Sequence, residues 1–258
     1  MLDCAGNGVD GVMDTLIITG ASRGIGAAVA RLAAKHYSIV VNSARDEAAT
    51  SQVVRGITSD GGRAVAICAD VSVERDVVRL FEEAERQLGS VRGLVNNAGV
   101  TGGFSRVESL TSETVMHVFA VNVVGTKLCS REAVRRMSTR NGGKGGGIVN
   151  VSSRASEIGG AGERVHYAAS KGAVDSFTIG LAREVSAEGI RVNAVSPGLI
   201  STELHAAAGA PDRMERLAPT IPMRRAGTAE EVAEGIVWLL SPAAAYVTGV
   251  ILPISGGR

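Results

Sequence analysis

The pair Tyr167 and Lys171 is the part of this chain best suited to acid–base chemistry. Their side chains are four residues apart, a spacing that puts them on one face of a helix. A free phenol has a pKa near ~10, and a neighbouring ammonium ion favours its phenolate form. We therefore expect Tyr167 to exchange a proton with an alcohol or carbonyl oxygen near neutral pH. The alternative is a surface tyrosine that precedes a lysine by one helical turn.

A glycine-rich turn near the start of the chain predicts a nucleotide site. The turn follows an apolar run at 15–18, which is typical of a buried strand, and precedes a helix-like run at 27–35. Strand, glycine turn and helix are the context of a dinucleotide-binding loop, although the spacing here is Gly-x-x-x-Gly-x-Gly. A plain strand-to-helix loop is the alternative. The residues predicted to contact the nucleotide are Gly20, Ser22, Arg23, Gly24, Ile25 and Gly26.

Two further loops follow predicted strands. The segment 96–99 comes directly after apolar Leu94 and Val95, and the segment 196–202 comes after the run 190–195. In open α/β sheets, ligands bind at the carboxyl ends of the strands. We therefore expect these loops and the glycine turn to converge on one crevice.

The elements that position these loops alternate along the chain. Strands are predicted at 15–19, 38–42, 64–68, 93–96, 147–151, 190–195 and 248–252, and helices at 25–35, 46–59, 73–88, 111–138, 167–187 and 228–240. This order predicts an α/β fold: a doubly wound Rossmann sheet of about seven parallel strands, with helices on both faces. We expect one catalytic domain over 13–258, a mobile substrate lid over about 199–227, and a disordered tail over 1–12. Met13 is a plausible first residue.

Composition excludes several classes of protein. The chain has 258 residues, 45% of them hydrophobic, and a net charge of +1, which suits one α/β domain and gives no sign of nucleic-acid binding. No apolar run is long enough to span a membrane, and no signal peptide is visible. The three cysteines are scattered, which predicts neither a metal site nor disulfides and favours the cytoplasm.

These motifs, in this order, resemble the short-chain dehydrogenase/reductase family over about 13–258. The resemblance implies a catalytic tetrad of Asn122, Ser153, Tyr167 and Lys171. Tyr167 would act as general acid and base, and Ser153 would hydrogen-bond the substrate oxygen, a role for which Ser152 is the other candidate. Lys171 would bind the nicotinamide ribose and favour the phenolate of Tyr167, while Asn122 would hold a proton-relaying water.

The same resemblance implies further cofactor contacts and an assembly. The cofactor would be lined by Asn97, Ala98 and Gly99, would meet Asp70 and Val71 at its adenine end, and would be covered at its nicotinamide end by Pro197, Gly198, Ile200 and Thr202. A homotetramer is implied as well. The chain is similar to bacterial glucose dehydrogenases and to 3-oxoacyl-carrier-protein reductases. A slightly lengthened segment at 157–163, which should border the pocket, leaves the substrate open.

The end of the second strand favours NADP(H) over NAD(H). An acidic residue there would bind the ribose 2′-hydroxyl, whereas an arginine accommodates a 2′-phosphate. This chain places Arg45 just after the strand, and Arg23 is a second cation in the glycine turn. Asp46 is predicted to cap the next helix. If it reached the ribose instead, the preference for NADP(H) would weaken.

The motifs together predict reversible hydride transfer between a nicotinamide cofactor and a small carbonyl or secondary alcohol substrate. Two other classes stay open. The chain could be a catalytically silent nucleotide-binding regulator, or a structural oligomer module that the nucleotide stabilises. Binding of the cofactor without turnover of any carbonyl compound would favour either of them.

Overall fold

A seven-stranded parallel sheet forms the centre of the molecule in the computed structural model, which describes residues 13–202 and 213–258. The strand order is β3-β2-β1-β4-β5-β6-β7, so the predicted Rossmann sheet is confirmed. Six strands lie close to their predicted positions, and β7 lies slightly further along the chain than expected. The strands are β1 (Thr15–Ile18), β2 (Ser38–Ser43), β3 (Ala64–Cys68), β4 (Val91–Asn96), β5 (Gly146–Val151), β6 (Ile190–Pro197) and β7 (Ile251–Ile254).

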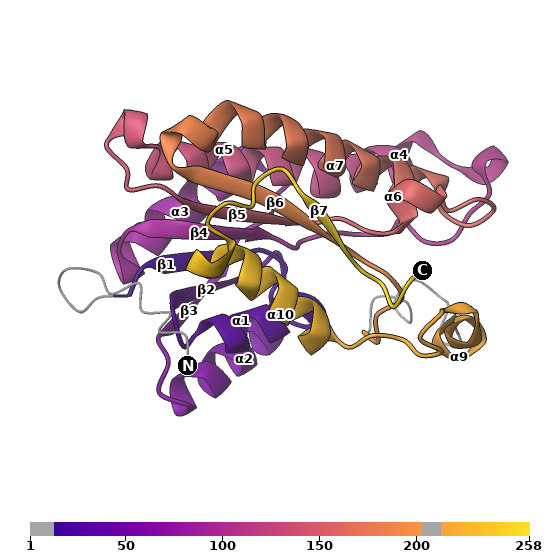
Figure 1. Ribbon diagram of the computed structural model, residues 1–258, viewed down its shortest axis with the longest axis horizontal. Helices are drawn as coiled ribbons and strands as arrows, with labels where there is room; N and C mark the ends of the chain where they lie inside the picture. Colours follow the sequence, from indigo (N-terminus) through magenta and orange to yellow (C-terminus); the bar gives the residue numbers. More distant parts are fainter. Residues whose placement is uncertain (1–12, 203–212) are drawn as a thin grey trace.

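Helices cover both faces of the sheet (Figure 1). One layer holds α1 (Gly24–Ala33), α2 (Glu47–Ser59) and α10 (Ala229–Leu240), and the other holds α3 (Glu74–Leu88), α5 (Thr126–Met137) and α7 (Val165–Val185). Shorter helices are α4 (Ser112–Phe119), α6 (Ala155–Ile158) and α9 (Arg213–Leu217), and 3₁₀ turns lie at Val107–Ser109, Thr139–Asn141, Ser186–Glu188, Ala218–Thr220 and Pro242–Ala244.

Apolar strands and capped helices explain this arrangement. Every residue of β1 and β2 is buried, as expected for strands with helices on both sides. The side chain of Asp46 accepts a hydrogen bond from the amide of Ala49 at 3.1 Å, so its predicted role as the cap of α2 is confirmed. Thr228 and Glu231 form a capping box at the start of α10. These caps fix where two helices of one layer begin.

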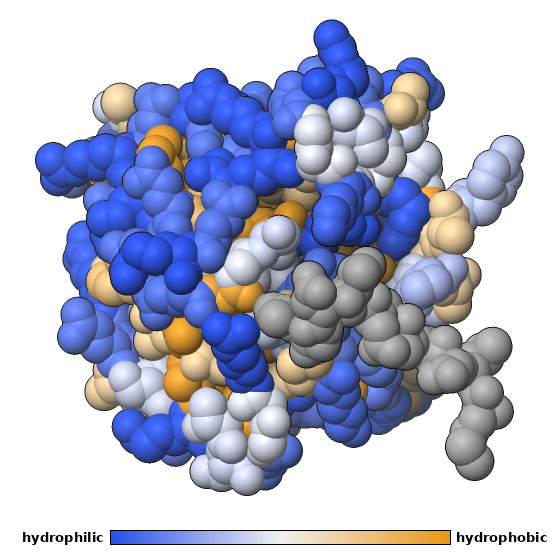
Figure 2. Space-filling model, turned by 90° about the vertical axis from the view of Figure 1, so that its left-hand side faces the viewer, coloured by the Kyte–Doolittle hydropathy of each residue, from blue (hydrophilic) through white to orange (hydrophobic). Residues whose placement is uncertain are grey.

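The order in which the chain adds strands to the sheet reverses between β1 and β4. Strand β1 pairs with both β2 and β4, which places Ile18 beside Val41 of β2 and Val95 of β4. Chain connections run away from this point in opposite directions, so the loops after β1 and β4 leave a crevice at the carboxyl ends. The opposite end of the molecule, where the strands begin, shows mainly hydrophilic side chains with small hydrophobic areas between them (Figure 2).

The predicted continuous helix over 111–138 is wrong in one respect. A π-helical segment, Ala120–Gly125, separates α4 from α5. Such segments widen a helix locally and often occur at functional sites. Here the widened turn contains Asn122, whose buried side chain hydrogen-bonds the backbone of Val100. The regular helix is therefore interrupted at the residue whose side chain hydrogen-bonds the loop after β4.

Some predictions fall on residues outside the described ranges. These are the tail at 1–12 and the central part of the lid, 203–212. On either side of that gap, Ile200 forms a parallel bridge with Gly227. Within residues 13–202 and 213–258, no helix has the length and apolar character needed to cross a bilayer.

Candidate active site

A cleft of about 560 Å³ opens at the carboxyl ends of the strands, where the strand order reverses between β1 and β4. It brings together residues predicted from separate parts of the sequence. The lining includes Gly20, Ser22, Arg23, Gly24, Ile25, Arg45, Asp70, Val71, Asn97, Ala98, Gly99, Ser153, Tyr167, Lys171, Pro197, Gly198, Ile200 and Thr202. Two predicted residues, Gly26 and Asn122, are not part of this lining, and both pack behind it.

Tyr167 and Lys171 lie one turn apart on α7 and share the wall of the cleft. Both are buried, with relative exposures of 7% and 5%. The Nζ atom of Lys171 lies 5.8 Å from the centre of the Tyr167 ring and donates a hydrogen bond to the carbonyl of Val151 at 2.7 Å. An ammonium has three donors, and this bond holds Lys171 against β5. The predicted proximity of the phenol and the cation is therefore present.

Ser153 lines the cleft just beyond β5. Its Oγ accepts a hydrogen bond from the amide of Ala155 at 3.1 Å, a bond that does not use the hydroxyl proton. Ser152 also lines the cleft, but its Oγ donates to the backbone carbonyl of Lys171 at 3.4 Å. Of the two serines, the geometry favours Ser153 as the group that meets a substrate oxygen.

Asn122 joins two parts of the site from behind. Its Oδ1 accepts from the amide of Val100 at 2.8 Å, and its Nδ2 donates to the Val100 carbonyl and to Ser170 Oγ at 2.9 and 3.0 Å. Ser170 in turn donates to the carbonyl of Tyr167 at 2.7 Å. Asn122 thus ties the loop after β4 to the helix that carries Tyr167.

The glycine turn is fastened to the loop after β4. The side chain of Asn97 donates to the carbonyls of Thr19 and Gly20 at 2.9 and 2.8 Å. In return, Thr19 Oγ1 accepts from the amides of Asn97 and Ala98, both at 3.0 Å. Sequence reasoning did not single out Thr19, yet it fixes the spacing between the two loops.

The turn fits the phosphates of a dinucleotide. Gly20 has φ of +62°, and a Cβ atom there would lie 2.7 Å from Ala98 Cα, so only glycine suits the position. Among the described residues, no side chain caps the start of α1. Gly24 and Ile25 at the start of α1 line the cleft, so the first amides and the positive end of the helix dipole could hold an anion there. Gly26 lets α1 pack closely against Asn97 and Gly20.

Replacing Gly20 by Ala should damage both stability and nucleotide binding. Left-handed backbone and overpacking against Ala98 together should cost about 2–4 kcal/mol. Urea unfolding and a titration with NADP(H) measure the two effects. Gly61→Ala is the control, because Gly61 also has positive φ but has open space around its Cβ direction. Equal losses in both variants would contradict the close approach at Gly20.

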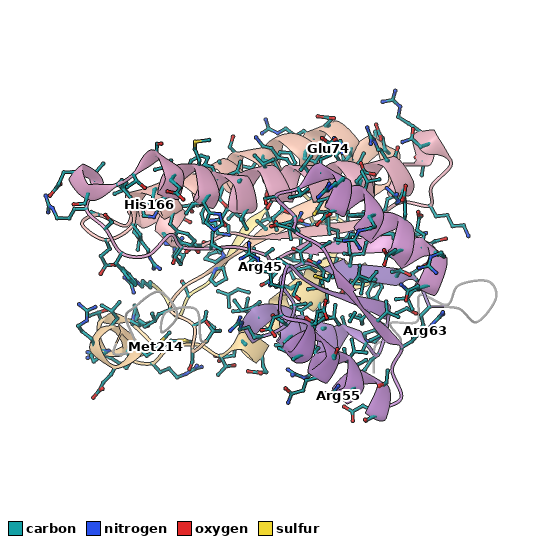
Figure 3. All side chains as sticks on the ribbon, turned by 180° about the vertical axis from the view of Figure 1, so that it is seen from behind. Arg45, Arg55, Arg63, Glu74, His166 and Met214 are labelled. Atoms are coloured by element: carbon teal, nitrogen blue, oxygen red, sulfur yellow. The ribbon has the colours of Figure 1, made fainter. Side chains whose placement is uncertain are left out.

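The end of the cleft beside Asp70 and Arg45 carries several charges. Partial burial raises the pKa of the Asp70 carboxyl, but hydrogen bonds from Ser72 and the charge of Arg45 outweigh it and hold the pKa below its ordinary value. Arg23 forms an exposed ion pair with Asp46 at 3.4 Å. Figure 3 places Arg45 between the two helix layers. Two guanidinium groups thus border this end.

His117 is a part of the cleft that the sequence did not predict. Its side chain is exposed and lines the cleft near Val121 and Asp70. The helical pattern alone could not reveal this, because it does not show which side of α4 borders the cleft.

A second cavity of about 330 Å³ adjoins the cleft. The two share Ser153, Arg164, Pro197 and Gly198. The lengthened segment 157–163 contributes Ile158, Gly160, Ala161 and Glu163 to its lining, so the prediction that this segment borders the pocket is confirmed. Sequence reasoning missed Arg164, although its place one turn before Tyr167 was a usable signal.

Within the described ranges, no group of three or more His, Cys, Asp or Glu side chains is arranged to hold a metal ion. The side chains that line the cleft include the phenol of Tyr167, the ammonium of Lys171 and the hydroxyl of Ser153.

Comparisons with known proteins agree with this geometry. A family model described as Enoyl-(Acyl carrier protein) reductase matches residues 20–258. The chain is 50% identical over 247 residues to the uncharacterized oxidoreductase YgfF of Escherichia coli K12, covering 95% of this chain and 100% of the relative. It is 36% identical over 244 residues to glucose 1-dehydrogenase 2 of Bacillus subtilis 168, covering 94% and 93%.

A solved structure gives the same result. The crystal structure of a short-chain type dehydrogenase/reductase from Mycobacterium marinum superposes with a TM-score of 0.90 at 32% identity, over 99% of this chain and 96% of that one. The motifs, the sheet order, the sequence relatives and this superposition all lead to one conclusion. The chain belongs to the short-chain dehydrogenase/reductase family of oxidoreductases.

Proposed function

We propose that the protein is an NADP(H)-dependent oxidoreductase that interconverts a carbonyl compound and a secondary alcohol. One observation carries the proposal. Tyr167, Lys171 and Ser153 line the same cleft as the glycine turn, so an acid–base group and a nucleotide-binding loop face one space. A reacting carbon held there would lie beside both.

The residues have separate tasks in this mechanism. A bound nicotinamide would supply the hydride for reduction or accept it for oxidation. In reduction, Tyr167 gives its hydroxyl proton to the carbonyl oxygen as the alcohol forms, and Ser153 donates a hydrogen bond to the same oxygen. Lys171 would hold the nicotinamide ribose. Asn122 ties the loop after β4 to α7, and the family resemblance implies that it would also hold a water that relays protons from Lys171. Pro197 and Gly198 would border the nicotinamide end.

A spectrophotometric screen tests the proposal. Oxidation of NADPH is followed at saturating cofactor with sugars, β-keto thioesters, quinones and simple ketones. We expect turnover with at least one of these classes. Tight NADPH binding with no turnover of any class would contradict the proposal and favour a nucleotide-binding regulator or a structural module instead.

The cofactor preference rests on Arg45 and Arg23. Both line the cleft after β2 and β1, where a 2′-phosphate would bring two negative charges. Asp46 caps α2 and forms an ion pair with Arg23, so both interactions of its carboxylate are made within the protein. We propose that these features together favour NADP(H) over NAD(H).

The preference is measured as the ratio of kcat/KM with NADPH to that with NADH. Arg45→Ala should lower this ratio about 10-fold or more, the effect of losing one charge-assisted contact to phosphate. Arg55→Ala on α2 is the control, because Figure 3 shows Arg55 on the outer end of that layer, away from Arg45. A wild-type ratio below one would contradict the preference.

The oligomeric state and the cellular compartment are proposed from the family resemblance. We propose a cytoplasmic homotetramer in which the layer carrying α4, α5 and α7 packs against its copies. Met116, Val124 and Ile179 of that layer are exposed apolar side chains, which supports contact with another surface.

A further inference from the structure

His166 is a buried histidine that has no part in the mechanism proposed for the cleft. It is the second residue of α7, directly before Tyr167, and its side chain is only 4% exposed. Figure 3 shows it in the helix layer that contains α7. Its Nε2 atom lies 2.9 Å from the carbonyl oxygen of Thr101, a residue of the loop after β4. The ring therefore connects the helix that carries Tyr167 to a loop of the active site.

This contact fixes which nitrogen of the His166 ring carries the proton. A carbonyl oxygen can only accept a hydrogen bond, so Nε2 must be the donor. The other nitrogen of a neutral ring, Nδ1, then carries no proton. It is buried without a hydrogen-bond partner among the residues that the structure describes. Within that part of the chain, the imidazole thus has one polar task, which is to hold the Thr101 carbonyl.

A second tie joins the same loop to α7. Asn122 Nδ2 donates to the Val100 carbonyl at 2.9 Å and to Ser170 Oγ at 3.0 Å. The carbonyls of Val100 and Thr101, which are consecutive in the loop, are therefore both tied to α7. One tie meets the helix before Tyr167 and the other meets it after Tyr167. Because the loop also lines the cleft, the two ties together set the distance between the loop and the phenol.

Close packing keeps the His166 ring in place. Gly102 has φ of +72°, and a Cβ atom there would lie 2.8 Å from His166 Nε2 and 2.7 Å from Val118 Cγ2. The neighbouring Gly103 also has positive φ, +80°, but no atom of the described residues lies within 4 Å of its Cβ position. The loop thus has a glycine at the point where its backbone meets the imidazole.

We propose that His166 is a positioning residue whose Nε2–H holds the loop after β4 at the distance from α7 that hydride and proton transfer require. The inference rests on the proposed oxidoreductase function and adds a residue to it. Among the described residues, His166 is not part of the cleft lining, so it acts through Thr101 and through the helix turn that carries Tyr167. Small displacements of reacting groups are costly to catalysis, which gives such a tie a measurable effect on turnover.

Substitutions of His166 separate the donor from the packing of the ring. The amide nitrogen of glutamine extends about as far from Cα as Nε2 does, whereas that of asparagine extends only about as far as Nδ1. His166→Gln should therefore keep the donor, and His166→Asn and His166→Met should lose it. At saturating NADPH and substrate, we expect kcat to fall about 10-fold in the last two, the effect of one lost hydrogen bond, and less than about threefold in His166→Gln.

Urea unfolding of the same variants distinguishes positioning from stability. All of them should be folded under the conditions of the assay. Losses of kcat that follow the presence of the donor support the proposal. Losses that instead follow the free energy of unfolding, with no advantage for His166→Gln over His166→Asn, would overturn it.

Gly102→Ala disturbs the same contact from the side of the loop. It should lower kcat about 10-fold, because the new methyl group displaces the imidazole. Gly103→Ala is the matched control, since it has the same left-handed strain without the close contact, and kcat should change less than about threefold. Combined with His166→Met, Gly102→Ala should cause little further loss, because both changes break one contact. A combined loss equal to the product of the single losses would overturn the proposal.

Measurements on the protein without substrate separate this inference from the proposed function. In ¹⁵N NMR spectra at about pH 8.5, where a free imidazole is neutral, the His166 signals are assigned by their loss in His166→Gln. We expect the proton on Nε2. The dissociation constant for NADPH should rise severalfold in His166→Asn but not in His166→Gln, and this pattern supports the proposal even if no carbonyl compound is turned over. Turnover by the wild type, combined with a proton on Nδ1 or with equal kcat in the three His166 variants, would uphold the oxidoreductase function and reject the role of His166.

Discussion

Tyr167→Phe should lower kcat by about 1,000-fold or more, because the variant keeps the ring but has no proton to give to the substrate oxygen. The ring is buried and packs between Arg164 and Lys171, so its removal as a whole would disturb the site. Losing only the hydroxyl leaves that packing in place. Steady-state kinetics with the best substrate of the screen measures the effect.

The dissociation constant for NADPH should change less than about threefold in the same variant, since loss of an interaction made with the substrate in the transition state leaves cofactor binding intact. Tyr246→Phe is the control, because Tyr246 is fully exposed. Parallel loss of turnover and NADPH binding in Tyr167→Phe would contradict the role given to the hydroxyl.

Lys171→Met should have the second largest effect, a loss in kcat/KM of about 100- to 1,000-fold. The ammonium lies beside the phenol and would also hold the ribose, so both chemistry and cofactor binding suffer. The variant also leaves the Val151 carbonyl without the donor it has at 2.7 Å, and the free energy of unfolding should fall by about 1–3 kcal/mol. Kinetics, NADPH titration and urea unfolding measure the three effects.

Lys127→Met is the control for Lys171→Met. Lys127 is exposed on α5 and lies over the ring of Phe177, so its charge is equal but remote from the cleft. Unlike Tyr167→Phe, Lys171→Met should weaken NADPH binding. Unchanged NADPH affinity in Lys171→Met would show that Lys171 does not contact the cofactor.

The sheet and the loops after its strands were predictable because both depend on local pattern. Buried parallel strands are short apolar runs, and β1 and β4 are bounded by Gly20 and by Asn97, whose types suit tight turns. The rule that ligands bind at the carboxyl ends of strands then brings distant loops together without any knowledge of distances. That Tyr167 and Lys171 share one face of a helix followed from the helical period, whereas their catalytic roles came from the family resemblance.

Features that depend on contacts between distant segments were not predictable. The π-helical turn contains Asn122, whose side chain hydrogen-bonds Val100, a residue of the loop after β4. Likewise, the position of Arg164 between Phe104 and Tyr167 requires two loops to fold against each other. No periodic pattern in the sequence predicts contacts between such distant segments.

The most direct test of the mechanism is a crystal structure of the complex with NADP⁺ and an unreactive analogue of the substrate. We expect the nicotinamide ring near Pro197 and Gly198, and the analogue oxygen within ~2.6–3.2 Å of both Tyr167 Oη and Ser153 Oγ. The phosphates should meet the first amides of α1. A nicotinamide bound outside this cleft, or a Tyr167 hydroxyl turned away from the analogue oxygen, would contradict the account.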